Sequence, residues 1–275
     1  MGDVDQNSSI WNESWDWSTG GDEWSEWWGG TPALWFGALL PRIHPFIPTG
    51  TILEIAPGYG RWTQYLKDAC DQLVLVDLAE KCIDSCRRRF AADSHITYHV
   101  NDGRSLAMVA DGSVDFVFSF DSLVHVEADV LESYLGQLAR KLTGDGVGFI
   151  HHSNIGHYPT LAAVARRAPA RWLKGAIDHG LLIDLLAWRA PTMTAERFAE
   201  MCRQAGLSCI SQEKISWEHG PYLIDALTVF TPVGSKWDRE SVVIRNPLFR
   251  QEADRMARLY ARPGPPGISP AGGAG

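Results

Sequence analysis

Histidine and aspartate side chains gather after two apolar segments near the middle of the chain. Asp121 and His125 follow the segment VDFVFSF, and His151 and His152 end the segment GVGFIHH. Histidine is the side chain best suited to remove a proton near neutral pH. Because side chains alternate along a strand, only one of the two adjacent histidines can face such a site. We expect His152 to be the general base and His151 to pack on the opposite side.

His125 has two interpretations, a second candidate base and a structural histidine at a turn. Asp121 could orient a histidine, and a divalent ion bound by Asp121 and His125 is the alternative to a histidine base. The chain has no recognisable spacing of metal ligands, so a metal is not favoured. Cys82 and Cys86 lie four residues apart, but no second pair completes a site, which indicates small buried residues.

A glycine turn follows the apolar segment TILEIA, which carries Glu54. The turn contains Pro57, Gly58 and Gly60, a composition that allows a ligand to come close to the backbone. No Lys-Ser or Lys-Thr pair follows, which excludes a P-loop. The third glycine of a dinucleotide-binding turn is also missing after Gly60.

Acidic residues follow the next two apolar segments: Asp77 ends QLVLVD, and Asn101-Asp102-Gly103 follows HITYHV. Together with the glycine turn, this set resembles the class I S-adenosylmethionine-dependent methyltransferases over roughly residues 51–231. The resemblance implies a bound S-adenosylmethionine. The residues that it assigns to this cofactor are Glu54, Pro57, Gly58, Gly60, Asp77, Leu78, Asn101, Asp102, Gly103 and Phe120.

The resemblance also implies roles for individual residues. The Asp77 carboxylate would accept hydrogen bonds from the ribose hydroxyls, and Asp102 would accept one from the adenine amino group, with Asn101 nearby. The glycines would let the backbone approach the amino-acid part. Methyltransferases of this type commonly have glycine where this chain has Pro57, which removes one N–H donor.

The chain is also similar to bacterial methyltransferases of polysaccharide and glycoside biosynthesis, through stretches such as HPFIPTGTILEIAPGYGRWTQYLK and FSFDSLVH. This similarity implies O-methylation of a sugar hydroxyl on a glycan or glycoside. A small-molecule O- or N-methyltransferase of secondary metabolism is the alternative. An NAD-dependent oxidoreductase, which could also use Asp77 for its ribose, and a non-catalytic module that binds S-adenosylmethionine are the remaining alternatives.

Apolar segments alternate with helix-length segments from Thr51 onward. Helices are predicted at about 60–70, 79–91 and 127–142, and Thr194 to Ala205 is a further helix with Thr194 as N-cap. This alternation predicts an α/β protein with a Rossmann-like, doubly wound, mostly parallel sheet. We expect seven strands, an antiparallel pair at one edge, and a helical insertion at 155–190 before strand six.

The chain is expected to divide into four parts: a Trp-rich N-terminal arm at 1–50, a methyltransferase domain at 51–231, an extension at 232–262 and a disordered tail at 263–275. The arm carries Trp11, Trp15, Trp17, Trp24, Trp27 and Trp28 within its first thirty residues. So much aromatic surface predicts that the arm packs over the active site or in an oligomer.

Composition limits the partners. The net charge of −8 argues against nucleic-acid binding, and no apolar run approaches the length of a membrane span. Five cysteines at irregular spacing are typical of reduced thiols in a cytoplasmic protein. We expect a small-molecule or glycan acceptor, and a homo-oligomer is compatible with the Trp-rich arm.

Overall fold

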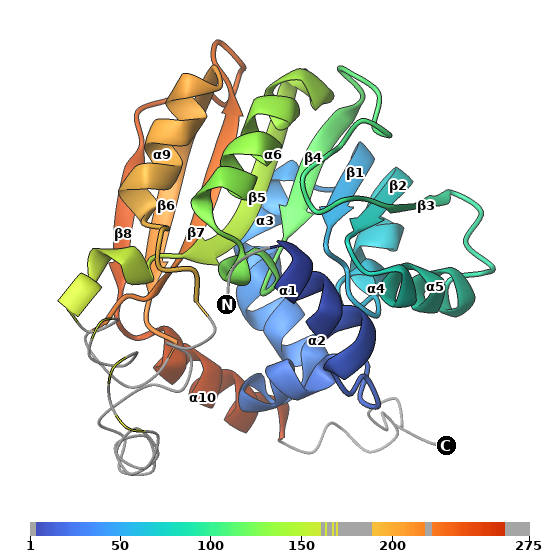
Figure 1. Ribbon diagram of the computed structural model, residues 1–275, viewed down its shortest axis with the longest axis horizontal. Helices are drawn as coiled ribbons and strands as arrows, with labels where there is room; N and C mark the ends of the chain where they lie inside the picture. Colours follow the sequence, from blue (N-terminus) through green and yellow to red (C-terminus); the bar gives the residue numbers. More distant parts are fainter. Residues whose placement is uncertain are drawn as a thin grey trace.

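The computed structural model describes residues 4–160, 163, 167, 169, 189–217 and 222–261. Its centre is a sheet of eight strands with the order β3-β2-β1-β4-β5-β7-β6-β8 (Figure 1). Neighbouring strands are parallel except where β7 pairs with β5 and β6. The strands are β1 (Thr49–Ile55), β2 (Cys70–Asp77), β3 (Ile96–Val100), β4 (Val114–Ser119), β5 (Leu142–Ser153), β6 (Leu207–Ile215), β7 (Asp225–Pro232) and β8 (Val242–Asn246).

Helices cover both faces of this sheet (Figure 1). The described α-helices are α1 (Val4–Ser9), α2 (Thr31–Leu34), α3 (Leu40–Ile43), α4 (Thr63–Leu66), α5 (Glu80–Arg89), α6 (Ala128–Lys141), α9 (Ala195–Gln204) and α10 (Phe249–Tyr260). The predicted helices near 60–70, 79–91, 127–142 and 194–205 therefore correspond to α4, α5, α6 and α9. The Thr194 hydroxyl accepts a hydrogen bond from the Arg197 amide at 3.0 Å, which confirms the predicted N-cap.

Alternation along the strands creates two hydrophobic layers. Phe116 and Phe118 of β4 and Phe149 of β5 belong to the layer that also holds α5 and the N-terminal helices. Val117 and Ile150, which point the other way, pack in the layer under α6 and α9. In α6, the leucines 131, 135 and 138 are all buried, as expected for one face of a helix.

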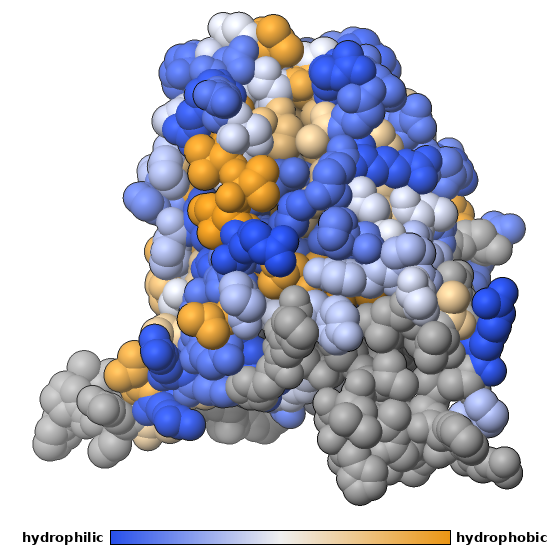
Figure 2. Space-filling view, turned by 90° about the vertical axis from the view of Figure 1, so that its left-hand side faces the viewer, coloured by the Kyte–Doolittle hydropathy of each residue, from blue (hydrophilic) through white to orange (hydrophobic). Residues whose placement is uncertain are grey.

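The sheet differs from the expected one in its size and its edge. Eight strands are present rather than seven, because β8 pairs in parallel with β6 and forms the edge. The predicted antiparallel pair, β6 and β7, lies inside that edge. Val242, Val243 and Ile244 of β8 are exposed, and the corresponding side of the molecule shows hydrophobic residues among hydrophilic ones (Figure 2).

The N-terminal segment is folded against the domain from Val4 onward. Short helical pieces, η1 (Ile10–Ser14), η2 (Asp22–Trp28) and η3 (Trp35–Leu39), connect α1 and α2 to the core. Trp28 is buried, and its ring lies 5.0 Å from that of Phe249 in α10, so the C-terminal helix supports the arm. Most of the predicted insertion at 155–190 and the tail at 263–275 fall outside the described residues.

Candidate functional site

A pocket opens where strands β1, β2, β3 and β4 end, and the N-terminal arm covers it. It encloses about 960 Å³, including its open mouth. Ligands of open α/β sheets bind at this edge. The lining residues come from the arm (Val4, Asn7, Trp11, Trp17, Gly20, Gly21, Trp24), from the strand ends (Ile55, Ala56, Pro57, Gly58, Tyr59, Arg61, Trp62, Val76, Asp77, Leu78, Cys82, Gly103), and from the region after β4 (Phe120, Asp121, Ser122, Leu123, His125, Val126, Val130, Tyr134).

The glycine turn uses its two glycines for different purposes. Gly58 lines the pocket with a φ of +58°, and a Cβ there would lie 3.2 Å from the Trp17 ring. Gly60 does not line the pocket; a Cβ there would lie 2.5 Å from the ring of Phe90. Gly60 is therefore required for packing against the end of α5, and Gly58 for close approach to the pocket.

Asp77 lies in the pocket at the end of β2, as the sequence predicts. Its carboxylate accepts hydrogen bonds from the Gly58 amide at 3.1 Å and the Ala79 amide at 2.8 Å. Burial raises the pKa of Asp77 to about 6, although these amides favour the charged form. The next residue, Leu78, also lines the pocket.

Besides Gly60, three of the predicted cofactor residues lie outside the pocket lining. Glu54 is buried beneath the turn, where it accepts a hydrogen bond from the Thr63 hydroxyl at 2.6 Å. Asp102 is exposed, and one of its oxygens accepts from the amides of Arg104 and Ser105. The Asn101 side chain holds the same loop by bonding to the Gly103 amide. Like Gly60, these three residues do not line the pocket, and their assignment to the cofactor stays a prediction.

The histidine pair of β5 has the opposite orientation to the one predicted. His152 is fully buried under α9, where its ring stacks on Phe198 at 4.2 Å. Its two nitrogens lie 2.9 Å from the Ser153 carbonyl and 2.8 Å from the Thr228 hydroxyl. Burial lowers the pKa of His152 to about 4. His152 does not line the pocket, so its predicted role as general base is wrong.

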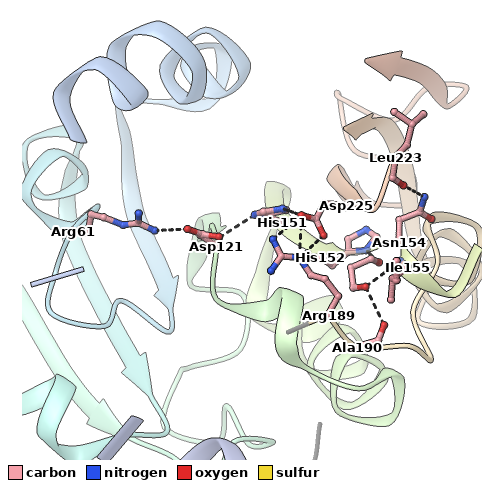
Figure 3. Close-up of polar contacts among 11 residues, drawn as sticks. Arg61, Asp121, His151, His152, Asn154, Ile155, Arg189, Ala190, Leu223 and Asp225 are labelled. Atoms are coloured by element: carbon pink, nitrogen blue, oxygen red, sulfur yellow. Dashed lines mark hydrogen bonds and ion pairs between the residues drawn. The ribbon is translucent and has the colours of Figure 1, made fainter. Parts of the chain in front are cut away.

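His151 faces the other layer and contacts the pocket indirectly. Its Nδ1 accepts a hydrogen bond from the Asp121 amide at 3.1 Å, and its Nε2 lies 3.4 Å from an Asp225 oxygen (Figure 3). Asp225 also forms a bidentate ion pair with Arg189. Burial favours the neutral form of Asp225, but the Arg189 guanidinium outweighs it and holds the pKa of Asp225 well below its usual range.

Asp121 lines the pocket and forms an ion pair with Arg61 at 2.9 Å (Figure 3). Its φ of 66° is unusual for a residue other than glycine. The Arg61 guanidinium also lies 4.4 Å from the ring centre of Trp62 and 5.4 Å from that of Trp24. Asp121 therefore reaches the pocket as predicted, but a buried arginine accompanies it.

Among the histidines that the structure describes, His125 lines the pocket. It ends η6 (Leu123–His125), is partly exposed, and lies 5.6 Å from the ring centre of Trp11. Trp11, Trp17 and Trp24 of the arm are packed edge-on or tilted against one another. The arrangement places one imidazole beside the indole rings of the arm, in the same pocket as the Asp121 side chain.

Sequence reasoning did not assign Asn7, Arg61 or Trp62 to the site. Arg61 and Trp62 follow the glycine turn directly, so their position in the motif was an available signal. Asn7 gives no such signal, because only the folded arm brings it to the pocket.

Among the described residues, no group of three or more His, Cys, Asp or Glu side chains is arranged to hold a metal ion. The described helices are also too short or too polar to cross a membrane.

Part of the chain is similar in sequence to known proteins. Residues 52–146 match the family described as a methyltransferase domain. Over 64 residues the chain is 34% identical to the ribosomal RNA small subunit methyltransferase A of Coxiella burnetii, which corresponds to 23% of this chain and 24% of that protein. The chain thus spans about a quarter of the length of the curated relatives it matches.

Two solved structures show the same fold. A Pyrococcus horikoshii OT3 protein superimposes with a TM-score of 0.51 at 18% identity, covering 82% of this chain and 95% of the other. The N-methyltransferase NodS of Bradyrhizobium japonicum superimposes with a TM-score of 0.50 at 16% identity, covering 73% and 97%. Residues 52–146 of the chain therefore match a methyltransferase domain, and the fold is the one that these two solved structures share.

Proposed function

We propose that the protein transfers a methyl group from S-adenosylmethionine to a hydroxyl group of a carbohydrate-type acceptor. One observation carries the proposal: the same pocket contains the glycine turn, Asp77, and a partly exposed histidine beside Trp11 of the arm. When bound, S-adenosylmethionine supplies the methyl group from its sulfonium centre. The protein then has to align an acceptor and remove its proton.

The residues at the strand ends suit this cofactor. Gly58 and Gly103 both have positive φ values and line the pocket, so a ligand can approach the backbone there. The Asp77 carboxylate offers oxygen acceptors for ribose hydroxyls beside Gly58. Pro57 lines the pocket as well, without an N–H to donate.

The acceptor side is aromatic and carries one ion pair. The apolar faces of sugar rings pack well on indoles, and Trp11 and Trp24 provide such faces. Asp121, already paired with Arg61, can accept a hydrogen bond from a second hydroxyl and so orient the ring. These contacts support a polyol with an apolar face more directly than a charged or fully apolar acceptor.

His125 is the proposed general base. It can take the proton of the attacking hydroxyl while the new carbon–oxygen bond forms and the carbon–sulfur bond breaks. His152 cannot take this role, because it is buried on the other side of the sheet. We therefore assign the base to His125, which the sequence analysis had left as the second candidate.

An amine acceptor is the second candidate function. The Arg61 guanidinium already lies over the rings of Trp24 and Trp62, and the same rings could hold an ammonium group. The Bradyrhizobium neighbour is an N-methyltransferase by its name, and the Coxiella relatives are named for ribosomal RNA. The net charge of −8 argues against an RNA acceptor here.

The test begins with the cofactor. Thermal shift should show stabilisation by S-adenosylmethionine and S-adenosylhomocysteine but not by NAD, since a ligand at 100 times its Kd adds about 2.7 kcal/mol. Formation of S-adenosylhomocysteine should then be measured with a panel of glycosides, sugar nucleotides and matched primary amines. Turnover of amines alone would replace the hydroxyl proposal, and binding without any turnover would indicate a non-catalytic module.

The base is tested with two histidine variants. His125→Ala should lower kcat by roughly 10²–10⁴-fold, the usual contribution of a general base, with little change in cofactor affinity. His152→Leu is the matched control and should keep the pH–rate profile. If His125→Ala retains the wild-type profile, His125 is not the base.

A further inference from the structure

Asn7 lines the cofactor pocket and carries a buried side-chain oxygen without a hydrogen-bond partner. The residue is only 5% exposed, and its Oδ1 accepts no hydrogen bond. Within the described part of the chain, six buried side-chain atoms are unpartnered, and only those of Asn7 and Trp62 belong to residues that line the pocket. A buried acceptor without a donor costs about 1–3 kcal/mol, so a ligand that supplies a donor would recover this free energy.

The location of Asn7 identifies the end of the pocket that it serves. Val4 lies one helical turn earlier on the same face of α1. A Cβ built on Gly103 would lie 2.8 Å from Val4 and 3.3 Å from Leu78. Val4 and Asn7 are thus placed beside the loops that follow β2 and β3, next to Asp77, the proposed ribose ligand.

The residues expected to bind the adenine amino group from this side are otherwise engaged. Asp102 is exposed and accepts from the amides of its own loop. The Asn101 side chain bonds to the Gly103 amide, the Ser105 carbonyl and the Tyr134 hydroxyl. One carboxylate oxygen of Asp102 and the Asn101 amide are thus already used within the loop that holds Gly103 in place.

We propose that the Asn7 side chain binds the edge of the adenine ring that carries the 6-amino group. Oδ1 accepts a hydrogen bond from the 6-amino group, and Nδ2 donates one to a neighbouring ring nitrogen. An asparagine amide matches this donor–acceptor pair of adenine in bidentate fashion. The inference rests on the proposed cofactor site and extends it. It assigns the selection of adenine to the N-terminal arm, whereas the glycine turn and Asp77 are assigned to the amino-acid and ribose parts of the cofactor.

The experiment compares two ligands on the full-length protein by calorimetry. One is S-adenosylhomocysteine, and the other is its analogue with hydrogen in place of the 6-amino group. The wild type should bind the amino compound roughly 5- to 150-fold more tightly, which corresponds to about 1–3 kcal/mol. In Asn7→Leu this ratio should fall to near one, and in Asn7→Asp, which keeps the acceptor, the preference should remain.

Asn12→Leu is the matched control in the same arm. Asn12 does not line the pocket, and its amide bonds to the Ser8 carbonyl at 3.1 Å; this variant should keep the wild-type ratio. Because Asn7 Oδ1 has no partner, Asn7→Leu should not lower the Tm of the ligand-free protein. If the larger side chain prevents folding, Asn7→Ala provides the same comparison.

The outcomes separate this inference from the proposed function. An unchanged ligand ratio in Asn7→Leu, or no preference in the wild type, overturns the role of Asn7 while leaving cofactor binding intact. Failure of the wild type to bind either ligand would instead overturn the cofactor site itself. Loss of the preference in Asn12→Leu would show that the arm acts through its packing and not through the Asn7 amide.

Discussion

Replacing Glu54 by glutamine should stabilise the protein at alkaline pH and leave the cofactor bound. Glu54 is 1% exposed, and one of its oxygens has no hydrogen-bond partner. Burial raises its pKa from 4.5 to about 8, and the hydrogen bond from Thr63 only partly offsets this effect. The folded protein therefore holds a proton on Glu54 at neutral pH that the unfolded chain has released.

The direction of the pH dependence follows from this difference. A carboxyl group whose folded pKa is raised contributes full stability below pH 4.5, and the contribution is lost as pH rises toward 8. At about 1.36 kcal/mol per pH unit, the interval corresponds to about 5 kcal/mol, an upper limit because water can enter around a charged group. The glutamine of Glu54→Gln stays neutral at every pH, so the variant should not lose this stability as pH rises.

Urea unfolding of both proteins from pH 5 to pH 9 measures the effect. The difference in unfolding free energy should shift toward Glu54→Gln by up to a few kcal/mol as pH rises from 5 to about 8, and it should level off above pH 8. Calorimetry with S-adenosylmethionine at pH 7 should give similar affinities. A folded Glu54→Gln protein that no longer binds the cofactor would refute this reasoning and restore the direct contact that the sequence predicts.

Three further predictions concern the pocket and its supports. Asp77→Ala should weaken S-adenosylmethionine binding by roughly 1.5–3 kcal/mol, the range for hydrogen bonds to a charged group, whereas unchanged affinity by calorimetry would exclude a ribose contact. Deleting residues 1–20, which keeps the buried Trp28, should leave the circular dichroism of the sheet intact and lower turnover; full activity would show that the arm is dispensable. His152→Leu should reduce acid sensitivity, because the stability that neutral His152 contributes is lost as pH falls from 6.5 to about 4; identical acid unfolding curves would contradict this.

Much of the fold can be predicted from the alternation of apolar segments with helix-length segments. The five parallel strands β1 to β5 and the helices between them were visible, because buried parallel strands carry continuous Val, Ile and Phe. Strand β8 was missed, since Val242, Val243 and Ile244 are exposed, and a strand of five residues at an edge has no burial pattern to read. Helical pieces in the arm were equally invisible, because glycines and tryptophans mask any helical period there.

The site was predicted in part, and the errors have a common cause. Residue order along a strand shows that His151 and His152 face opposite layers, but it cannot show which layer borders the pocket. That is decided by register: Phe118 pairs with Phe149, which places His151 on the side of Phe120. Asp102 does lie after β3, but residue order could not show that the following turn uses one of its carboxylate oxygens for the Arg104 and Ser105 amides.

The position of Asp121 in the pocket depends on residues that are far away in the sequence. Asp121 adopts a φ of 66°, and its amide donates to Nδ1 of His151, so that this nitrogen must be the unprotonated one. The proton of a neutral His151 then lies on Nε2, which faces Asp225. Since Arg189 keeps Asp225 ionised, the Arg189–Asp225 pair favours the tautomer that can accept from the Asp121 amide. A buried ion pair on the far side of β5 thereby positions the carboxylate that the acceptor is proposed to meet.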